Sequence, residues 1–176
     1  MSTFDKEYFF VRASRDDRVP FLGADKDTQR KNYLWEVQPI GAKPFIFHNT
    51  DYEEGDKILP IDPPPEILFN GNNPLVCDRI AEKLHDLEIP NLAIQAAIFI
   101  DPKDVWHENY WFLTFLKRFD CWDRENSTYG SEPVRDETLK YEIYTYSLNE
   151  KLLRETPLKE RLLFKMGGTT TGFITA

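Results

Sequence analysis

The chain has 176 residues, of which 41% are hydrophobic and 30% charged, a composition typical of a globular protein rather than a disordered one. Its net charge of −8 argues against binding to nucleic acid or to an anionic membrane surface, because both require a basic face. Two cysteines are too few for a disulfide framework. The N-terminal run also lacks the basic and apolar regions of a signal peptide, so we expect a cytoplasmic protein.

The first third of the chain is predicted to be rich in strands. Short aromatic and β-branched runs at 7–12, 33–37 and 44–48 are typical of β-strands. A polar loop follows, and its acidic residues are Asp51, Glu53, Glu54 and Asp56. The proline-rich segment 60–65 predicts an extended surface stretch, because proline fixes φ and cannot donate a backbone hydrogen bond. We expect a single domain over 1–176, with this segment as the candidate junction between a β-rich lobe at 1–60 and a main lobe at 66–176.

One amphipathic helix is predicted in the middle of the chain, over 74–87. It follows a short strand at 66–69 that ends at Asn70-Gly71, a strong turn pair. Asn73 is suited to cap the helix, and Pro74 is suited to its first position. Apolar residues then recur at helical spacing, at Val76, Ile80, Leu84 and Leu87. This stripe predicts that one face of the helix packs on a sheet.

The second half of the chain predicts further strands. The segments 92–100 and 110–119 are apolar on both faces, which indicates central strands, whereas 105–110 is expected to be a loop. Strands are also predicted at 141–148, 161–165 and 169–175, and 151–155 is either a strand or a helical turn. The fold class is therefore α+β, with a mixed, mainly antiparallel sheet, one main packed helix at about 74–87 and a few short helical pieces. The expected core residues are Val76, Ile80, Leu84, Ile94, Ile98, Leu113 and Phe115.

The residue types predict no catalytic constellation. The three histidines, His48, His85 and His107, lack the spacing of a metal site, and Cys121 lies between carboxylates that disfavour a reactive thiolate. The sequence has no glycine-rich phosphate loop and no serine nucleophile elbow. We therefore expect no metal, no cofactor and no catalysis. The alternative is a small enzyme that acts on a polar metabolite through carboxylates and His107, which a concave pocket holding these groups would favour.

Two segments resemble a family of bacterial immunity proteins that are encoded beside polymorphic or contact-dependent toxins and were long catalogued as a domain of unknown function. The run from Ile67 to Leu84 is similar to the strand–turn–helix signature of this family, although Cys77 stands where the family commonly has serine. A second segment, from Tyr110 to Tyr129, is similar to its aromatic strand followed by two aspartates and a serine–aromatic pair. The resemblance implies a chain that binds a toxin (effector) protein and neutralises it.

The acidic charge specifies the kind of partner that we expect. A net charge of −8 fits a basic partner such as a nuclease toxin, because complementary charge speeds encounter. Aromatic and charged anchors carry most of the energy of such interfaces, and the predicted partner-binding residues are Asp51, Glu53, Glu54, Asp56, Asp120, Trp122 and Asp123. Asp120 and Asp123 are equally suited to stabilise a turn, since aspartate is common there. An adaptor domain without a toxin partner is a further alternative, and a homodimer through the C-terminal strand also stays open.

Overall fold

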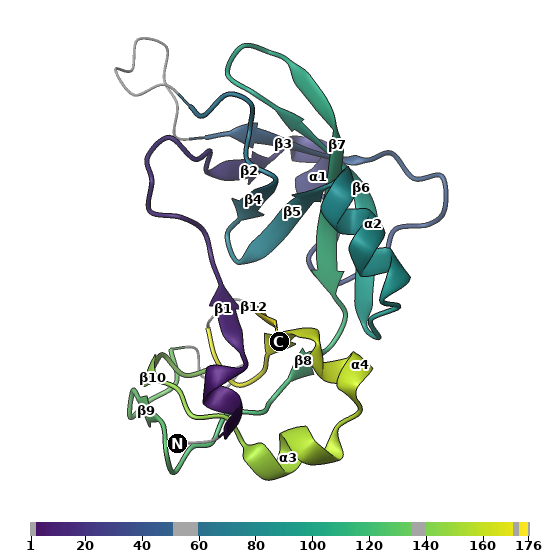
Figure 1. Cartoon of the computed structure of the whole chain (residues 1–176). Helices are drawn as coiled ribbons and strands as arrows, with labels where there is room; N and C mark the ends of the chain where they lie inside the picture. The colour runs from purple at the N-terminus through teal and green to yellow at the C-terminus, as the bar shows by residue number, and fades with distance from the viewer. Residues whose placement is uncertain (1–2, 51–59, 135–139, 171–172, 176) are drawn as a thin grey trace. The chain divides into compact units, whose positions relative to one another are not determined.

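A computed structural model describes residues 3–50, 60–134, 140–170 and 173–175, and these form two compact units (Figure 1). The described parts of 12–88 and 92–116 make up one, which we call the barrel unit. The described parts of 1–11, 89–91 and 117–176 make up the other, the terminal unit. The junction expected at 60–65 is therefore not a unit boundary. That segment lies within the barrel unit, where the Tyr110 hydroxyl donates a 2.8 Å hydrogen bond to the Pro65 carbonyl.

The barrel unit contains a six-stranded sheet in the order β2-β3-β6-β7-β5-β4. Its strands are β2 (Leu22–Ala24), β3 (Phe45–Asn49), β4 (Ile67–Asn70), β5 (Asn73–Cys77), β6 (Leu92–Ile100) and β7 (Trp106–Phe115). All neighbouring strands in this order are antiparallel except β3 and β6, which are parallel. A mixed, mainly antiparallel sheet with a few short helices confirms the predicted α+β class.

The two edge strands of this sheet meet, so the sheet closes on itself in a barrel-like form. An isolated bridge joins Phe21 to Phe69, and the Asn70 side chain donates a 2.7 Å hydrogen bond to the Leu22 carbonyl. Side chains that alternate along each strand fill the interior, as the pleat of a closed sheet requires. This inner core comprises Leu22, Phe45, Phe47, Leu68, Leu75, Cys77, Ala97, Phe99, Tyr110 and Phe112.

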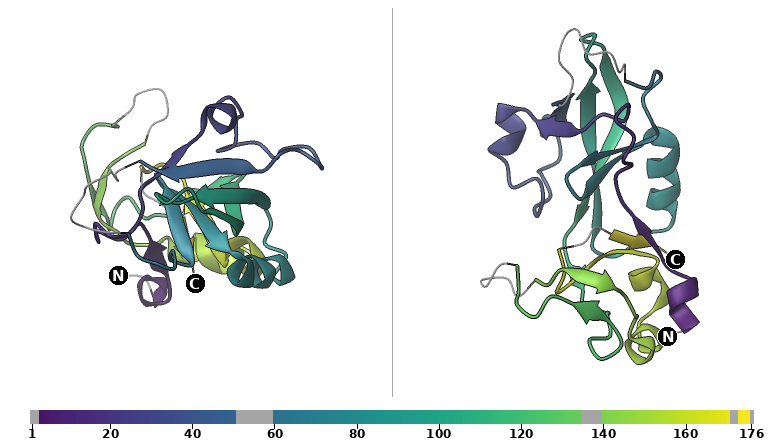
Figure 2. Two further views of the ribbon diagram at one scale, coloured as in Figure 1. Left: turned by 90° about the horizontal axis from the view of Figure 1, so that it is seen from above. Right: turned by 90° about the vertical axis from the view of Figure 1, so that its left-hand side faces the viewer.

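Helix α2 (Asp78–Asp86) lies along the outer face of the sheet, beside β5 and β7 (Figures 1 and 2). The predicted start at Pro74 is wrong, because 73–77 instead pairs as β5 between β4 and β7. The Asn70-Gly71 turn explains this difference, since Gly71 has φ +57° and closes a β4–β5 hairpin. Helix α2 therefore begins after Cys77, which makes no side-chain capping bond. Ala81 is the buried residue of the helix, whereas Leu87 of the predicted stripe is exposed.

The central strands are confirmed, with differences at their ends. Strand β6 has the predicted bounds, but β7 begins at Trp106, so the loop expected at 105–110 is wrong. The strand predicted at 33–37 is also wrong, because these residues form turns and an extended loop; the short α1 (Lys26–Gln29) precedes them. Four predicted core residues are buried, namely Val76, Ile98, Leu113 and Phe115. The other three, Ile80, Leu84 and Ile94, are half-buried beside the outer face.

The terminal unit contains a four-stranded sheet in the order β1-β12-β11-β8 and a separate β9–β10 pair. Its strands are β1 (Phe9–Val11), β8 (Arg118–Phe119), β9 (Thr128–Tyr129), β10 (Ile143–Thr145), β11 (Leu163–Met166) and β12 (Phe173–Thr175). Its helices are η1 (Thr3–Lys6), α3 (Glu150–Glu155) and α4 (Leu158–Arg161), so 151–155 is helical. The predicted strand 110–119 is thus divided, because β8 belongs to this second sheet. Among the described residues, no helix is long and apolar enough to cross a membrane.

Candidate functional site

The predicted partner-binding residues fall into two groups. Asp51, Glu53, Glu54 and Asp56 lie outside the described residues. Asp120 and Asp123 lie in the terminal unit and make local contacts. Asp120 pairs with Arg124 at 2.7 Å, and Asp123 Oδ1 accepts hydrogen bonds from the backbone amides of Glu125 and Asn126. These contacts match the turn-stabilising alternative for Asp123, and the partner-binding role of both aspartates stays a prediction.

Trp122 is 1% exposed and lies in the core of the terminal unit. The Arg124 guanidinium lies over its indole at 4.3 Å, and the Tyr129 ring meets it edge-on at 4.9 Å. Its Nε1 is buried with no hydrogen-bond partner among the described residues, and a Cβ on Gly168 would lie 3.0 Å from this nitrogen. In this conformation Trp122 is a core side chain and offers no face to a partner.

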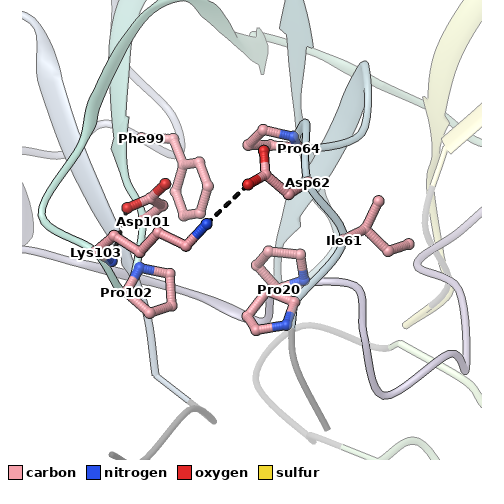
Figure 3. Close-up of a pocket in the computed structure, with 9 residues that line it drawn as sticks. Pro20, Ile61, Asp62, Pro64, Phe99, Asp101, Pro102 and Lys103 are labelled. Carbon is pink, nitrogen blue, oxygen red and sulfur yellow. Dashed lines mark hydrogen bonds and ion pairs between the residues drawn. The ribbon is translucent and has the colours of Figure 1, made fainter.

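A pocket of about 240 Å³ lies at one end of the barrel unit (Figure 3). Phe99 lies beneath its floor, where the ring has no exposed surface, and the remaining lining comes from three separate chain segments. The lining residues are Pro20, Pro60, Ile61, Asp62, Pro64, Phe99, Asp101, Pro102 and Lys103. Backbone bonds hold this proline-rich wall, since the Ile61 amide donates to the Arg18 carbonyl at 2.9 Å. The pocket is mostly apolar, and we call it the proline-walled pocket.

His107 lies directly behind this floor because of an irregularity in the β6–β7 pairing. Ala97 pairs with Tyr110, but Phe99 pairs with His107, so β7 contributes one extra residue between these pairs. Such a bulge re-aims side chains at the rim of a closed sheet. Both Tyr110 and His107 consequently contact Phe99; the His107 ring stacks on it at 5.6 Å and 19°. His107 Nε2 also lies 3.1 Å from Asp101 Oδ2.

Asp101 organises the turn between β6 and β7. Its Oδ1 accepts hydrogen bonds from the backbone amides of Lys103 at 2.8 Å and Val105 at 3.0 Å. Burial alone would raise the pKa of this carboxyl. The hydrogen bonds from His107 and the two amides outweigh burial and lower the pKa below its usual value of 3.8. Asp101 is therefore an ionised structural carboxylate whose oxygens are occupied, which suits it to hold His107 in place.

Replacing Asp101 by asparagine is expected to destabilise the protein at pH 7 by about 1 kcal/mol, because the charged acceptor for His107 is lost while Oδ1 can still accept in the turn. The folded-state pKa is below the unfolded value, so the contribution of the carboxylate is present above pH 3.8 and is lost as pH falls through the folded pKa. Urea unfolding of the parent and Asp101→Asn proteins from pH 7 to below pH 3.8 checks this prediction. A difference in unfolding free energy that stays constant over this pH range would contradict it.

The enzyme alternative requires carboxylates and His107 at a pocket, and the structure brings these groups together but with both carboxylates already paired. Two carboxylates, Asp62 and Asp101, line the proline-walled pocket, and His107 contacts Asp101 from behind. Both oxygens of Asp101 already accept hydrogen bonds, and Asp62 pairs with Lys103 at 2.8 Å. The described lining carries no hydroxyl or thiol nucleophile. Cys121 is no candidate either, because burial and Asp120 raise its pKa to about 12.

Three of the exposed apolar side chains of the barrel unit lie on one loop, residues 33–43, which we call the anchor loop. Trp35 is 52% exposed, Val37 is 53% exposed, and Ile40 is fully exposed next to Gly41, whose φ is +84°. The short aromatic and β-branched run at 33–37 produced the wrong strand prediction here. The Pro39–Gly41 turn was the one sequence signal that this segment protrudes as a loop.

Two polar side chains of the sheet, the half-buried Gln95 and the buried Thr114, hold the anchor loop in place. Gln95 of β6 accepts a 2.7 Å hydrogen bond from the Gln38 amide and donates to Thr114 of β7 at 2.7 Å. Thr114, fully buried, donates in turn to the Tyr33 carbonyl at 3.0 Å. The loop backbone is thus held at Tyr33 and Gln38, on either side of the exposed Trp35 and Val37, and the fully exposed Ile40 follows. Such a preorganised apolar surface is typical of a partner-binding site.

Comparisons with known proteins assign no family. No protein-family model matches the chain, and no curated protein matches it. The described residues contain no group of three or more histidine, cysteine, aspartate or glutamate side chains placed to hold a metal ion.

Proposed function

We propose that the protein is an immunity protein. It acts in the cytoplasm, binds a cognate bacterial toxin domain and neutralises it by occluding the active site or the access of substrate, with no chemistry of its own. The anchor loop is the observation that carries this proposal. The resemblance of 67–84 and 110–129 to an immunity family and the net charge of −8, which suits a basic toxin, support it further.

The anchor loop has the properties of an interface hot spot. Tryptophan is enriched among hot-spot residues, and Trp35 lies beside two further exposed apolar side chains. Water already solvates these side chains in the free protein, so a partner that covers them gains the hydrophobic free energy of their burial. The bonds from Gln95 hold the loop before binding, so little ordering entropy opposes association. Acidic side chains elsewhere on the surface would accelerate encounter with a basic partner.

Affinity capture tests the proposal. The tagged protein is recovered from its native host at two salt concentrations, in cells shown to express the adjacent toxin locus. We expect one stoichiometric toxin-like partner, and its yield falls at the higher salt concentration because screening weakens charge attraction. Expression of that partner alone should kill a test cell, and co-expression should rescue it. Capture of no protein from such cells would overturn the proposal.

Replacing Trp35 by alanine is expected to weaken toxin binding about 30-fold, the effect of a hot spot worth about 2 kcal/mol. An exposed side chain contributes little to folding, so the melting temperature should stay close to that of the parent. Calorimetric titration with the purified toxin domain measures the affinity.

Leu158→Ala is the matched control, because Leu158 is 56% exposed and lies on α4 of the other unit. Equal affinity for the Trp35→Ala protein and this control would show that the anchor loop is not the binding surface. A double variant with Ile40→Ser should lose still more affinity, and cells that carry it should lose protection against the toxin.

A small enzyme is the second candidate function, favoured by the contact between Asp101 and His107 behind the proline-walled pocket. A screen of polar metabolites for turnover tests it. Turnover that disappears in a His107→Gln protein of unchanged stability would favour the enzyme over the immunity protein.

A further inference from the structure

We propose that the proline-walled pocket binds a small, uncharged aromatic molecule. This site lies in the barrel unit, and the proposal is independent of toxin binding by the anchor loop. Its volume of about 240 Å³ exceeds the roughly 150 Å³ in which a cavity lined by apolar side chains holds benzene. The pocket therefore has room for one ring system with a small substituent.

The walls are suited to a flat ring. Pro20, Pro60, Pro64 and Pro102 surround the floor, and proline has little conformational freedom to lose when a ligand binds. Phe99 at the floor is held between two rings, with His107 stacked at 5.6 Å and Tyr110 edge-on at 6.3 Å. The Phe99 ring has no exposed surface, so it supports the floor from beneath, and an entering ring packs on the flat faces of the prolines.

The charges of the pocket indicate that the ligand is neutral. Lys103 Nζ pairs with Asp62 Oδ2 at 2.8 Å, so these two charges already compensate each other. Asp101 accepts two backbone hydrogen bonds and contacts His107, so its charge is compensated within the β6–β7 turn. A charged ligand would have to displace one of these partners and lose its own water. An uncharged ring fills the apolar space with the existing pairs intact.

The Asp62–Lys103 pair also favours a free molecule over a side chain that remains attached to a partner protein. Figure 3 shows this pair joining the segment 60–64 to the β6–β7 turn across the pocket. Both side chains are about 70% exposed, and exposed ion pairs contribute little stability, so the pair opens readily. A free molecule lets the pair form again after entry, whereas an attached side chain would keep the walls apart.

Titration with indole, followed through the amide resonances of the full ¹⁵N-labelled chain, tests this proposal. We expect saturable shifts at Phe99, Asp101, Lys103 and Ile61, with the resonances of the terminal unit unchanged. Benzylammonium and benzoate serve as the charged probes and should each bind at least about tenfold more weakly than indole, because charge must be desolvated. The absence of saturable shifts, or tighter binding of either charged probe, would overturn the assignment.

Ile61→Trp fills the pocket from its rim, and its backbone bond to Arg18 is preserved. It should weaken indole binding at least about tenfold. Leu87→Trp is the matched control, since it adds the same side chain at an exposed position of the same unit outside the pocket and should leave the affinity unchanged. Retention of the parent amide spectrum outside the pocket shows that both variants fold. Equal weakening by the two variants, or none by Ile61→Trp, would place the indole elsewhere.

Discussion

Replacing Phe112 by alanine is expected to lower the free energy of unfolding of the barrel unit by about 3–5 kcal/mol. Phe112 is fully buried at the centre of a ring cluster. It stacks on Phe47 at 5.5 Å and 15°, and it meets Tyr33 and Phe45 edge-on at 5.3 and 5.6 Å. Removing the ring leaves a cavity inside the closed sheet. The cavity cannot collapse unless the backbone of the surrounding strands moves. Urea unfolding, followed by amide resonances of each unit, measures the loss.

Phe21→Ala is the control for this experiment. Phe21 precedes β2 in the same unit, its side chain is half exposed, and its bridge to Phe69 involves only the backbone. Its replacement should cost less than about 1 kcal/mol. Comparable losses for the two variants would mean that the inner ring cluster is not the main core of the barrel unit.

Replacing Trp122 by alanine is expected to cost about 3–5 kcal/mol in the terminal unit, because the buried indole packs against Tyr129, Tyr141 and the Arg124 guanidinium. Trp122→Phe should cost much less, since it keeps a ring and removes the Nε1–H that has no partner among the described residues. Thermal unfolding of the three proteins, read in the resonances of each unit, checks the order.

The Trp122 series also separates the structural role from the predicted anchor role. If Trp122 acts only in the core, the Trp122→Ala protein should lose toxin binding only in proportion to the fraction of the protein that is unfolded. A direct anchor would make Trp122→Ala lose affinity at temperatures where the unit is fully folded. The second outcome, with unchanged stability, would contradict the buried position of the indole.

Periodicity predicted the long elements of the fold well and the short ones poorly. The apolar run 92–100 is long enough to specify β6 by itself, and it agrees with the structure. The apolar stripe that begins at Val76 misplaced the start of α2. Val76 is buried, but an apolar residue at this position fits a strand as well as a helix, and here it belongs to β5. The competing signal was local: Asn70-Gly71 forces a hairpin, and the hairpin takes 73–77 as its second strand. Turn chemistry therefore outweighed helical spacing.

The candidate sites could be predicted only in part, because tertiary contacts create them. His107 was predicted as a candidate catalytic residue. Its position behind Phe99, however, depends on a bulge in the pairing of β6 with β7. The proline-rich run at 60–65 was assigned to the surface, while the β6–β7 turn that completes the pocket lies some forty residues later. Trp35 was missed altogether. Its exposure depends on Gln95 and Thr114, which hold the backbone of a segment whose aromatic and β-branched residues are typical of a strand.

The junction between β2 and β4 also has a consequence for self-association. Open sheets end in rows of unpaired amides and carbonyls that can template the addition of a strand from another molecule. Here Asn70 spans the two edges, because its amide donates to the Leu22 carbonyl while its Oδ1 accepts from the Tyr33 hydroxyl at 3.0 Å. One side chain thus joins the two edge strands at the point where they meet. We expect replacement of Asn70 by alanine to increase strand-mediated self-association of the protein, which light scattering of the two concentrated proteins would measure.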